Sequence, residues 1–283
     1  FILLTAALAV CAVNEHNGTP QLAQDGAVAV DSTDGTAGGN MEGKETRFGI
    51  ATSVTWAAWT TAASNGSVNS MHDSYTPVGG LVPMLLMQLG EVVFGGVGCG
   101  LYGMLAFAIL AVFIAGLMVG RTPEYLGKKI EGREMKLIVI VLILHPLLIL
   151  GFSALAVVNQ AGLAGITNPG FHGLSQVLYE FASSAANNGS GFEGLADNTG
   201  FWNMTTGIVM FLGRYIPIIA QIAIAGSLLA KRRMNESVGT LRTDNVLFML
   251  ILVFIVYIFA ALTFFPALAL GPIAEHLILW YPM

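Results

Sequence analysis

Long apolar segments constrain the fold of this chain more than any other feature. They lie at about residues 80 to 120, 137 to 158, 201 to 230 and 245 to 270, and a membrane-spanning helix needs about 20 apolar residues. Only 10% of the residues are charged, whereas an ordinary soluble domain has about 25%. We therefore expect an all-α, multi-pass membrane protein. Nucleic acid is not an expected partner, because no basic face remains once the loops are accounted for.

Two basic loops set the expected topology. Residues 121 to 136 and 231 to 242 hold most of the Lys and Arg, so the positive-inside rule places both loops in the cytoplasm. The spans between them then leave residues 159 to 200 outside. That outer stretch contains GLSQVLYEFASSAA, which is apolar but too short to cross a membrane. It is typical of a re-entrant pore helix.

The first apolar segment is too long for one straight helix. Its centre, GEVVFGGVGCGLYG, has six glycines in fourteen residues, which predicts a break near Gly95 to Gly100. Irregular backbone at membrane depth is tolerated where it is buried in protein or lines a wet cavity. Close helix packing through small residues is the alternative explanation of these glycines.

The pattern divides the chain into five parts. We expect the end of a transmembrane helix at 1–13, an extracytoplasmic loop at 14–45, a pore-loop repeat with its broken helix and cytoplasmic loop at 46–136, a second such repeat and loop at 137–243, and a final transmembrane helix at 244–283.

An internal repeat is the most specific signal. The octet TTAASNGS, which begins at Thr60, returns 123 positions later as SSAANNGS, which begins at Ser183. Five of the eight positions are identical, and two more exchange Thr for Ser. A short apolar helix precedes each octet, and a long apolar segment follows it. The chain therefore contains at least two helix, pore loop, helix units.

The octets predict a site for a dehydrated potassium ion. Backbone carbonyl oxygens can replace its water shell if the chain turns them inward. Such a turn commonly needs φ > 0, which glycine adopts without steric strain. The C-terminal end of each short helix also directs its negative dipole end to the cation. Gly66 and Gly189 are the first candidates, and an ordinary exposed Asn-Gly turn is the alternative.

Several strings of the chain resemble the KdpA family, the potassium-binding subunits of the Kdp P-type ATPases, within the superfamily of potassium transporters. They are NMEGKETRFG, TTAASNGSVNSMHDS, GLVPMLLMQLGEVVFGGVGCGLYGM, GRTPEYLGKKI, SSAANNGS and LTFFPALALGPIAE. The strings cover about residues 40 to 276. GRTPEYLGKK and GEVVFGGVGCGLYG favour this family over a stand-alone potassium transporter or channel that works with a soluble regulatory ring.

The resemblance is to the C-terminal half of these subunits. It implies four repeats around a pseudo-fourfold pore, of which this chain would supply the third and fourth. It implies a selectivity filter made of Ser64, Asn65, Gly66, Ser67, Asn187, Asn188, Gly189 and Ser190. External K+ would pass from this filter through an intramembrane tunnel to an ATP-hydrolysing subunit, with small accessory subunits of the Kdp complex as further partners. The location implied is the inner or cell membrane of a bacterium or archaeon.

Three charged residues are candidates for the pathway or its gate. Arg214 is a lone charge inside an apolar span, where a charge is costly unless it faces a cavity or a partner. The resemblance places it close to the ion pathway, and a salt bridge to Glu180 or Glu91 is the structural alternative. Glu91 could assist a cation or cap a broken helix end. The resemblance associates Arg121 with the inner gate, and an ordinary positive-inside anchor would look the same.

We do not expect this chain to be an enzyme. It has no D-K-T-G phosphorylation motif, and GGNMEGKE has Glu where a nucleotide-binding loop needs Ser or Thr for Mg²⁺. ATP hydrolysis is therefore expected in a partner chain, with no organic cofactor and no metal other than K+. A membrane scaffold that only anchors an ATPase is an alternative of another class, and the duplicated octet argues against it.

Overall fold

The chain is mostly helical in the computed structural model, which describes residues 2–20, 38–93, 95–96, 99–120, 122–233 and 241–281. Four helical stretches are long and apolar enough to cross a membrane, namely Gly100–Met118, Gly132–Val158, Gly200–Ala230 and Val246–Trp280. They belong to α5 (Cys99–Val119), α6 (Gly132–Val158), α9 (Gly200–Ala230) and the run of α10 (Val246–Leu268), η2 (Ala269–Ile273) and α11 (Ala274–Trp280). Hydrophobic length thus correctly predicted the long helices.

The other helices are shorter. They are α1 (Ile2–Asn17), α3 (Gly49–Ala62), η1 (His72–Ser74), α4 (Pro77–Gln88), α7 (Gln160–Leu163) and α8 (Phe171–Ala186). Two strands of two residues each, β1 (Glu124–Tyr125) and β2 (Lys128–Lys129), pair as an antiparallel hairpin. This hairpin is the departure from the all-α expectation within the described residues.

The glycine-rich segment breaks the first apolar stretch, as predicted. Helix α4 ends at Gln88 and α5 begins at Cys99, so the break starts earlier than Gly95. Gly90 and Gly95 both have positive φ, 80° and 76°. A Cβ on Gly95 would overlap the Cα of Gly100, so the backbone folds back closely on itself and only glycine fits there.

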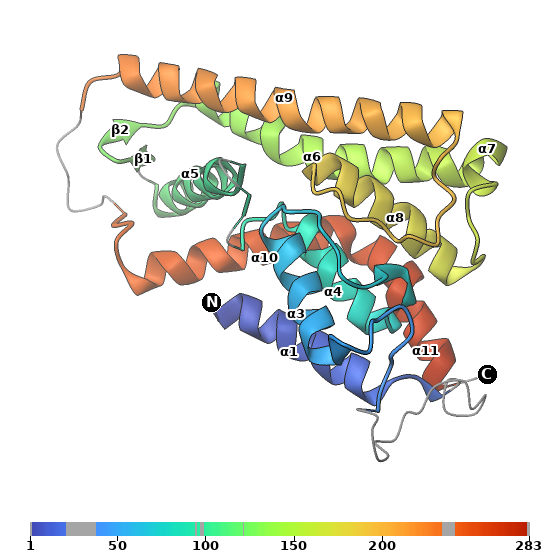
Figure 1. The fold of residues 1–283 in the computed structure, drawn as a ribbon. Helices are drawn as coiled ribbons and strands as arrows, with labels where there is room; N and C mark the ends of the chain where they lie inside the picture. The colour runs from blue at the N-terminus through green and yellow to red at the C-terminus, as the bar shows by residue number, and fades with distance from the viewer. Residues whose placement is uncertain are drawn as a thin grey trace.

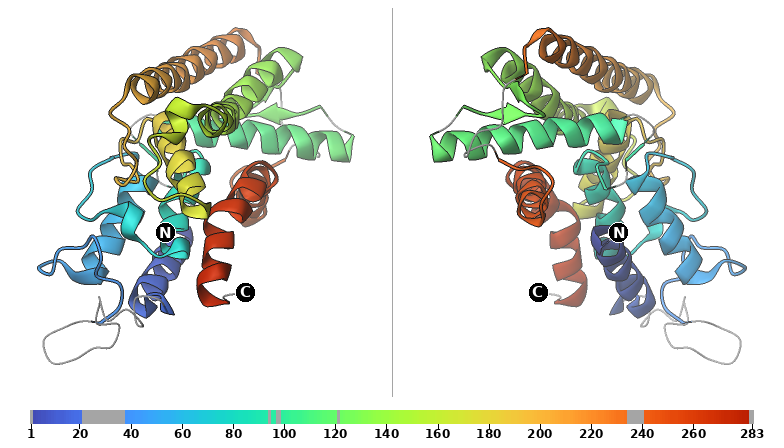
Figure 2. Two further views of the ribbon diagram at one scale, coloured as in Figure 1. Left: turned by 90° about the vertical axis from the view of Figure 1, so that its right-hand side faces the viewer. Right: turned by 90° about the vertical axis from the view of Figure 1, so that its left-hand side faces the viewer.

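Helices α6 and α9 lie side by side along one edge of the molecule, and α1 and α3 lie on the opposite side (Figures 1 and 2). Helix α8 packs against α6, α9 and α4, so it lies in the interior. The long helices leave large apolar side chains outside, with Phe211, Ile222 and Leu262 exposed by 61%, 67% and 80%. Apolar exposure on this scale fits contact with lipid or with another protein surface.

The two basic loops meet at one end of the molecule. Lys231 follows α9, and its ammonium group donates to the backbone oxygen of Lys129 at 2.9 Å and lies 2.8 Å from a Glu134 carboxylate oxygen. The Lys128 ammonium group in turn donates to the Lys231 carbonyl. In Figure 1, β1 and β2 lie beside the end of α9. This contact agrees with the expectation that both loops face the same side of the membrane.

Candidate functional site

The two octets have closely similar backbone conformations. Ser64 and Asn187 occupy matching positions and both have left-handed φ, 52° and 56°. Gly66 and Gly189 also match, with φ of 80° and 106°. Because left-handed φ is disfavoured for most residues other than glycine, four such angles at matched positions indicate that the two octets share one backbone conformation.

The same hydrogen bonds hold each octet in this shape. The Asn65 amide donates to the Thr60 carbonyl at 3.0 Å, and the Asn188 amide donates to the Ser183 carbonyl at 2.9 Å. In each loop the Asn side-chain oxygen accepts from the Ser amide two residues later, at 3.1 Å both times. These are Asx turns, a local hydrogen bond that fixes the loop after the helix ends.

The two loops meet at their glycines. A Cβ placed on Gly66 would overlap the carbonyl oxygen of Asn188 and lie 3.1 Å from the Cα of Gly189. Helices α3 and α8 both end at these loops. The structure thus brings together the two octets that the sequence singled out, with a backbone oxygen of one directed at the glycine of the other.

A further correspondence extends the repeat beyond the octets. Thr76 caps the start of α4 by accepting from the amide three residues on, and Thr199 caps α9 in the same way. These two residues are again 123 positions apart. At the same spacing, Gly90 and Glu91 correspond to Gly213 and Arg214. Sequence reasoning missed this pairing, although the constant spacing could have revealed it.

Glu91 lies beside the two loops, at the break after α4. It is 2% exposed and has a positive φ of 51°. Its carboxylate accepts from the Asn188 side-chain amide at 2.9 Å, and that amide also donates to the Thr60 carbonyl at 2.9 Å. Glu91 therefore links the break after α4 to both octets. This connection was not foreseen from the sequence.

Arg214 lies within α9 and is partly buried. Within the described residues no hydrogen bond or ion pair of its guanidinium group is found, and neither Glu91 nor Glu180 lies within salt-bridge distance. The salt-bridge alternative is therefore not realised in this structure. Arg121, the third candidate, lies outside the described residues.

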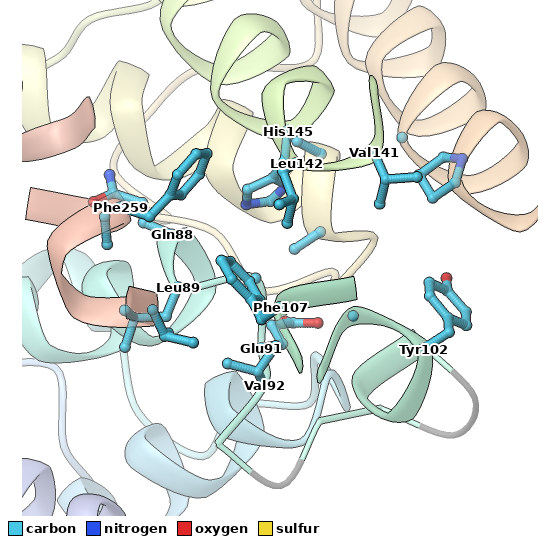
Figure 3. Close-up of a pocket in the computed structure, with 18 residues that line it drawn as sticks. Gln88, Leu89, Glu91, Val92, Tyr102, Phe107, Val141, Leu142, His145 and Phe259 are labelled. Carbon is cyan, nitrogen blue, oxygen red and sulfur yellow. The ribbon is translucent and has the colours of Figure 1, made fainter. Parts of the chain in front are cut away.

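A cavity of about 100 Å³ lies next to the break, between α5, α6, α8, α9 and α10. Glu91, Tyr102 and His145 contribute to its wall (Figure 3). Gln88 also lines it, is 3% exposed, and its side-chain oxygen and nitrogen have no hydrogen-bond partner among the described residues. Buried polar groups of this kind are normally satisfied by ordered water or another ligand.

A charged cluster ties three elements together near the start of α8. The His172 ring donates to Asp73 from Nε2 at 3.0 Å and to Glu275 from Nδ1 at 2.9 Å. Burial by itself lowers the pKa of His172, but the hydrogen bonds to Asp73 and Glu275 outweigh it and raise the pKa to about 9. Asp73, His172 and Glu275 form a partly buried triad, with side chains exposed by 12%, 12% and 19%.

The triad predicts a pH-dependent stability. A histidine whose pKa rises on folding from 6.5 to about 9 stabilises the fold fully below about pH 6.5, and this contribution disappears as the pH rises through 9. One pKa unit corresponds to about 1.4 kcal/mol, so we expect His172→Gln to cost up to about 3 kcal/mol at pH 6. Thermal unfolding between pH 6 and 10 should show the gap to wild type closing with rising pH.

A suitable control is His276→Gln, one residue beyond Glu275, since His276 has no hydrogen bond to a carboxylate within the described residues. Its effect on stability should be small. A gap for His172→Gln that stays constant to pH 10 would contradict a protonated imidazole.

The fold and the site together define a polytopic membrane protein in which two matched glycine loops meet inside a helical bundle. A family model described as "KdpA: Potassium-transporting ATPase A subunit" matches residues 1–277. The chain therefore belongs to the KdpA family.

Individual relatives agree with this assignment. The potassium-transporting ATPase potassium-binding subunit of Clostridium perfringens is 62% identical over 277 residues, which are 98% of this chain and 48% of the relative. Those of Geobacillus kaustophilus and Methylococcus capsulatus are 57% and 58% identical, over 98% of this chain and 48% and 46% of the relatives. The chain spans about half the length of the curated relatives it matches.

Proposed function

We propose that this chain forms part of the potassium-binding subunit of an ATP-driven potassium uptake complex, and that its two octets contribute to a K+ selectivity filter. The observation that carries the proposal is the meeting of Gly66 with Asn188 and Gly189, in loops that share their left-handed angles and their Asx turns. Rings of backbone carbonyl oxygens are the usual means of binding dehydrated potassium.

The short helices would assist the loops electrostatically. Helices α3 and α8 both end immediately before the filter residues. The last turn of a helix has unpaired carbonyls and carries a partial negative charge. Two helix ends directed at one place would therefore stabilise a cation there, without the fixed charge that would hold it too tightly for release.

We further propose that α3 to α4 and α8 to α9 are two helix, pore loop, helix repeats of a pseudo-fourfold arrangement. The constant spacing of 123 residues supports this, since it relates the octets, the capping residues Thr76 and Thr199, and the pair Glu91 and Arg214. Because two loops close only half of a fourfold ring, the remaining repeats would come from the part of the subunit that this chain does not span.

Below the filter, Glu91 and Arg214 would lie on or beside the ion pathway, and Arg121 would lie near its inner gate. Glu91 contacts a filter side chain directly, at 2.9 Å from Asn188. The cavity beside it, with the unpartnered amide of Gln88, could hold water or a partly hydrated ion on the route to the ATP-hydrolysing subunit. The complex would work in the cell membrane, with small accessory subunits.

The test is a comparison of ATP hydrolysis by three purified preparations. The full-length subunit assembled with its ATP-hydrolysing partner should turn over ATP and be stimulated by potassium. This chain by itself should neither hydrolyse ATP nor carry potassium selectively, because it lacks a phosphorylation motif and half of the proposed ring. The partner subunit without the potassium-binding subunit should not respond to potassium.

Mass spectrometry should first establish that the preparation of this chain contains no other subunit. Robust ATP turnover by the chain alone would overturn the proposal. So would a full complex whose ATP hydrolysis is indifferent to potassium.

A further inference from the structure

Each filter loop is tethered by an aromatic side chain of the helix that precedes it. Trp56, on α3, donates from its indole Nε1 to the backbone oxygen of Ser67 at 2.9 Å. Tyr179, on α8, shares a hydrogen bond of 3.0 Å between its hydroxyl group and that of Ser190. Both tethers join residues that are eleven positions apart in sequence, and the two tethers are separated by the same 123 residues as the octets.

The Tyr179 tether is completely buried and has a defined direction. The side-chain amide nitrogen of Asn188 donates to Thr60 and Glu91, so its oxygen is the acceptor that faces the Ser190 hydroxyl at 2.7 Å. Ser190 therefore uses its only proton on Asn188 and must accept from Tyr179. A continuous chain of hydrogen bonds thus runs from Tyr179 to the second filter loop.

The other side of Tyr179 is held equally firmly. Since its proton goes to Ser190, its oxygen accepts from Nδ1 of His72, at 2.8 Å. Tyr179 and His72 are both 0% exposed, and the tyrosine ring stacks on Phe192 with centroids 4.3 Å apart. The Tyr179 side chain is therefore fixed by two hydrogen bonds at its hydroxyl group and by one stacking contact of its ring. This is the rigid support that a precise binding geometry requires.

We propose that Trp56 and Tyr179, at matching places in the two repeats, are positioning residues that set the spacing of the filter oxygens, so that discrimination between potassium and other monovalent cations depends on them. The proposal rests on the proposed function of the octets. Its physical basis is that selectivity needs oxygens held at a chosen distance. A loop released from its tether can relax around a larger ion such as rubidium, while the capacity to bind a cation is kept.

The two tethers should not contribute equally. Tyr179 belongs to a buried network, whereas Trp56 is 45% exposed in the described structure and makes a single bond to its loop. A buried hydrogen bond that leaves a partner unsatisfied has a larger effect than an exposed one. We therefore expect Tyr179→Phe to reduce the preference for potassium over rubidium by about tenfold, and Trp56→Phe to reduce it by about threefold.

The experiment measures stimulation of ATP hydrolysis by potassium and by rubidium in the full-length complex, and compares the ratio of their half-saturating concentrations. Tyr75→Phe is the matched control. It also removes a buried hydroxyl group, 5% exposed as a residue, but this hydroxyl bonds Ser70 at 2.8 Å, outside the octets. The ratio should change in both tether variants and stay constant in Tyr75→Phe.

The outcomes separate the two proposals. If the wild-type complex prefers potassium but both tether variants keep the wild-type ratio, the tethers are merely structural and this inference is wrong, while the proposed function stands. If the wild-type complex does not respond to potassium, the proposed function fails and the inference fails with it. Should Tyr179→Phe not assemble, Trp56→Phe decides the question, because its change lies at an exposed ring.

Discussion

Replacing Gly66 by alanine should weaken the apparent potassium affinity by roughly 100-fold, whereas the same change at Gly189 should weaken it by roughly tenfold. Both glycines have positive φ, so alanine is strained at either position. Only at Gly66 would the new methyl group also overlap the carbonyl oxygen of Asn188. At Gly189 the nearest atom to such a group is the Cα of Gly66, at an ordinary 3.8 Å.

The measurement is the potassium concentration that half-saturates ATP hydrolysis in the full-length complex. Gly200→Ala is the control, since this glycine opens α9, has no positive φ and has no neighbour within 4 Å of an added Cβ. It should leave the affinity unchanged. Aspartate at Gly66 or Gly189 should in addition relax discrimination against rubidium or ammonium. Equal, wild-type affinities for both alanine variants would rule out the filter assignment.

A second large effect is expected at a buried ion pair. Lys44 lies 2.7 Å from Glu15, and both side chains are 0% exposed. Lys44→Met would leave the Glu15 carboxylate buried without its counter-charge, which typically costs about 3–5 kcal/mol. The same carboxylate also accepts from the amide and hydroxyl of Thr76, both at 2.7 Å. A displacement of the Glu15 carboxylate should therefore also destabilise the start of α4, where Thr76 is the N-cap.

Thermal unfolding of the full-length subunit in detergent tests this expectation. Arg47→Met is the matched control, because Arg47 pairs with Glu45 in an exposed ion pair, and exposed pairs contribute about 0–1 kcal/mol. Adding Glu15→Gln to Lys44→Met should recover part of the lost stability, since the second substitution removes the unpaired buried charge. The buried pair would have no special role if Lys44→Met destabilised the subunit no more than Arg47→Met.

The sequence by itself determined the membrane class, the long helices and the octets. A helix in lipid must be apolar for its whole length, so α6 and α9 could be identified from hydropathy alone. The glycines of the octets could be found because left-handed backbone restricts residue choice locally. The break after α4 was also readable, since Gly95 comes so close to Gly100 that a side chain does not fit.

Tertiary structure decided how these parts are held together. Residues 14 to 45 were expected to form an exposed loop, yet α1 continues to Asn17, and Glu15 and Lys44 are fully buried against each other. Nothing in local composition distinguishes these two charges from solvated ones. Glu15 and Lys44 are 29 positions apart in sequence, so the burial of this pair depends on how α1 packs against α3 and α4.

The contacts that support the proposed filter loops could not be predicted from the sequence either. Trp56 and Tyr179 look like ordinary apolar members of short helices, and the sequence analysis gave neither a role. The bond between Asn188 and Glu91 spans 97 positions, and that between His72 and Tyr179 spans 107. Hydrophobic periodicity and the placement of glycines indicate the local backbone conformation and whether a segment faces lipid or water. Which polar groups pair across such distances is fixed by the packing of the helices, because each buried donor must find an acceptor within that packing.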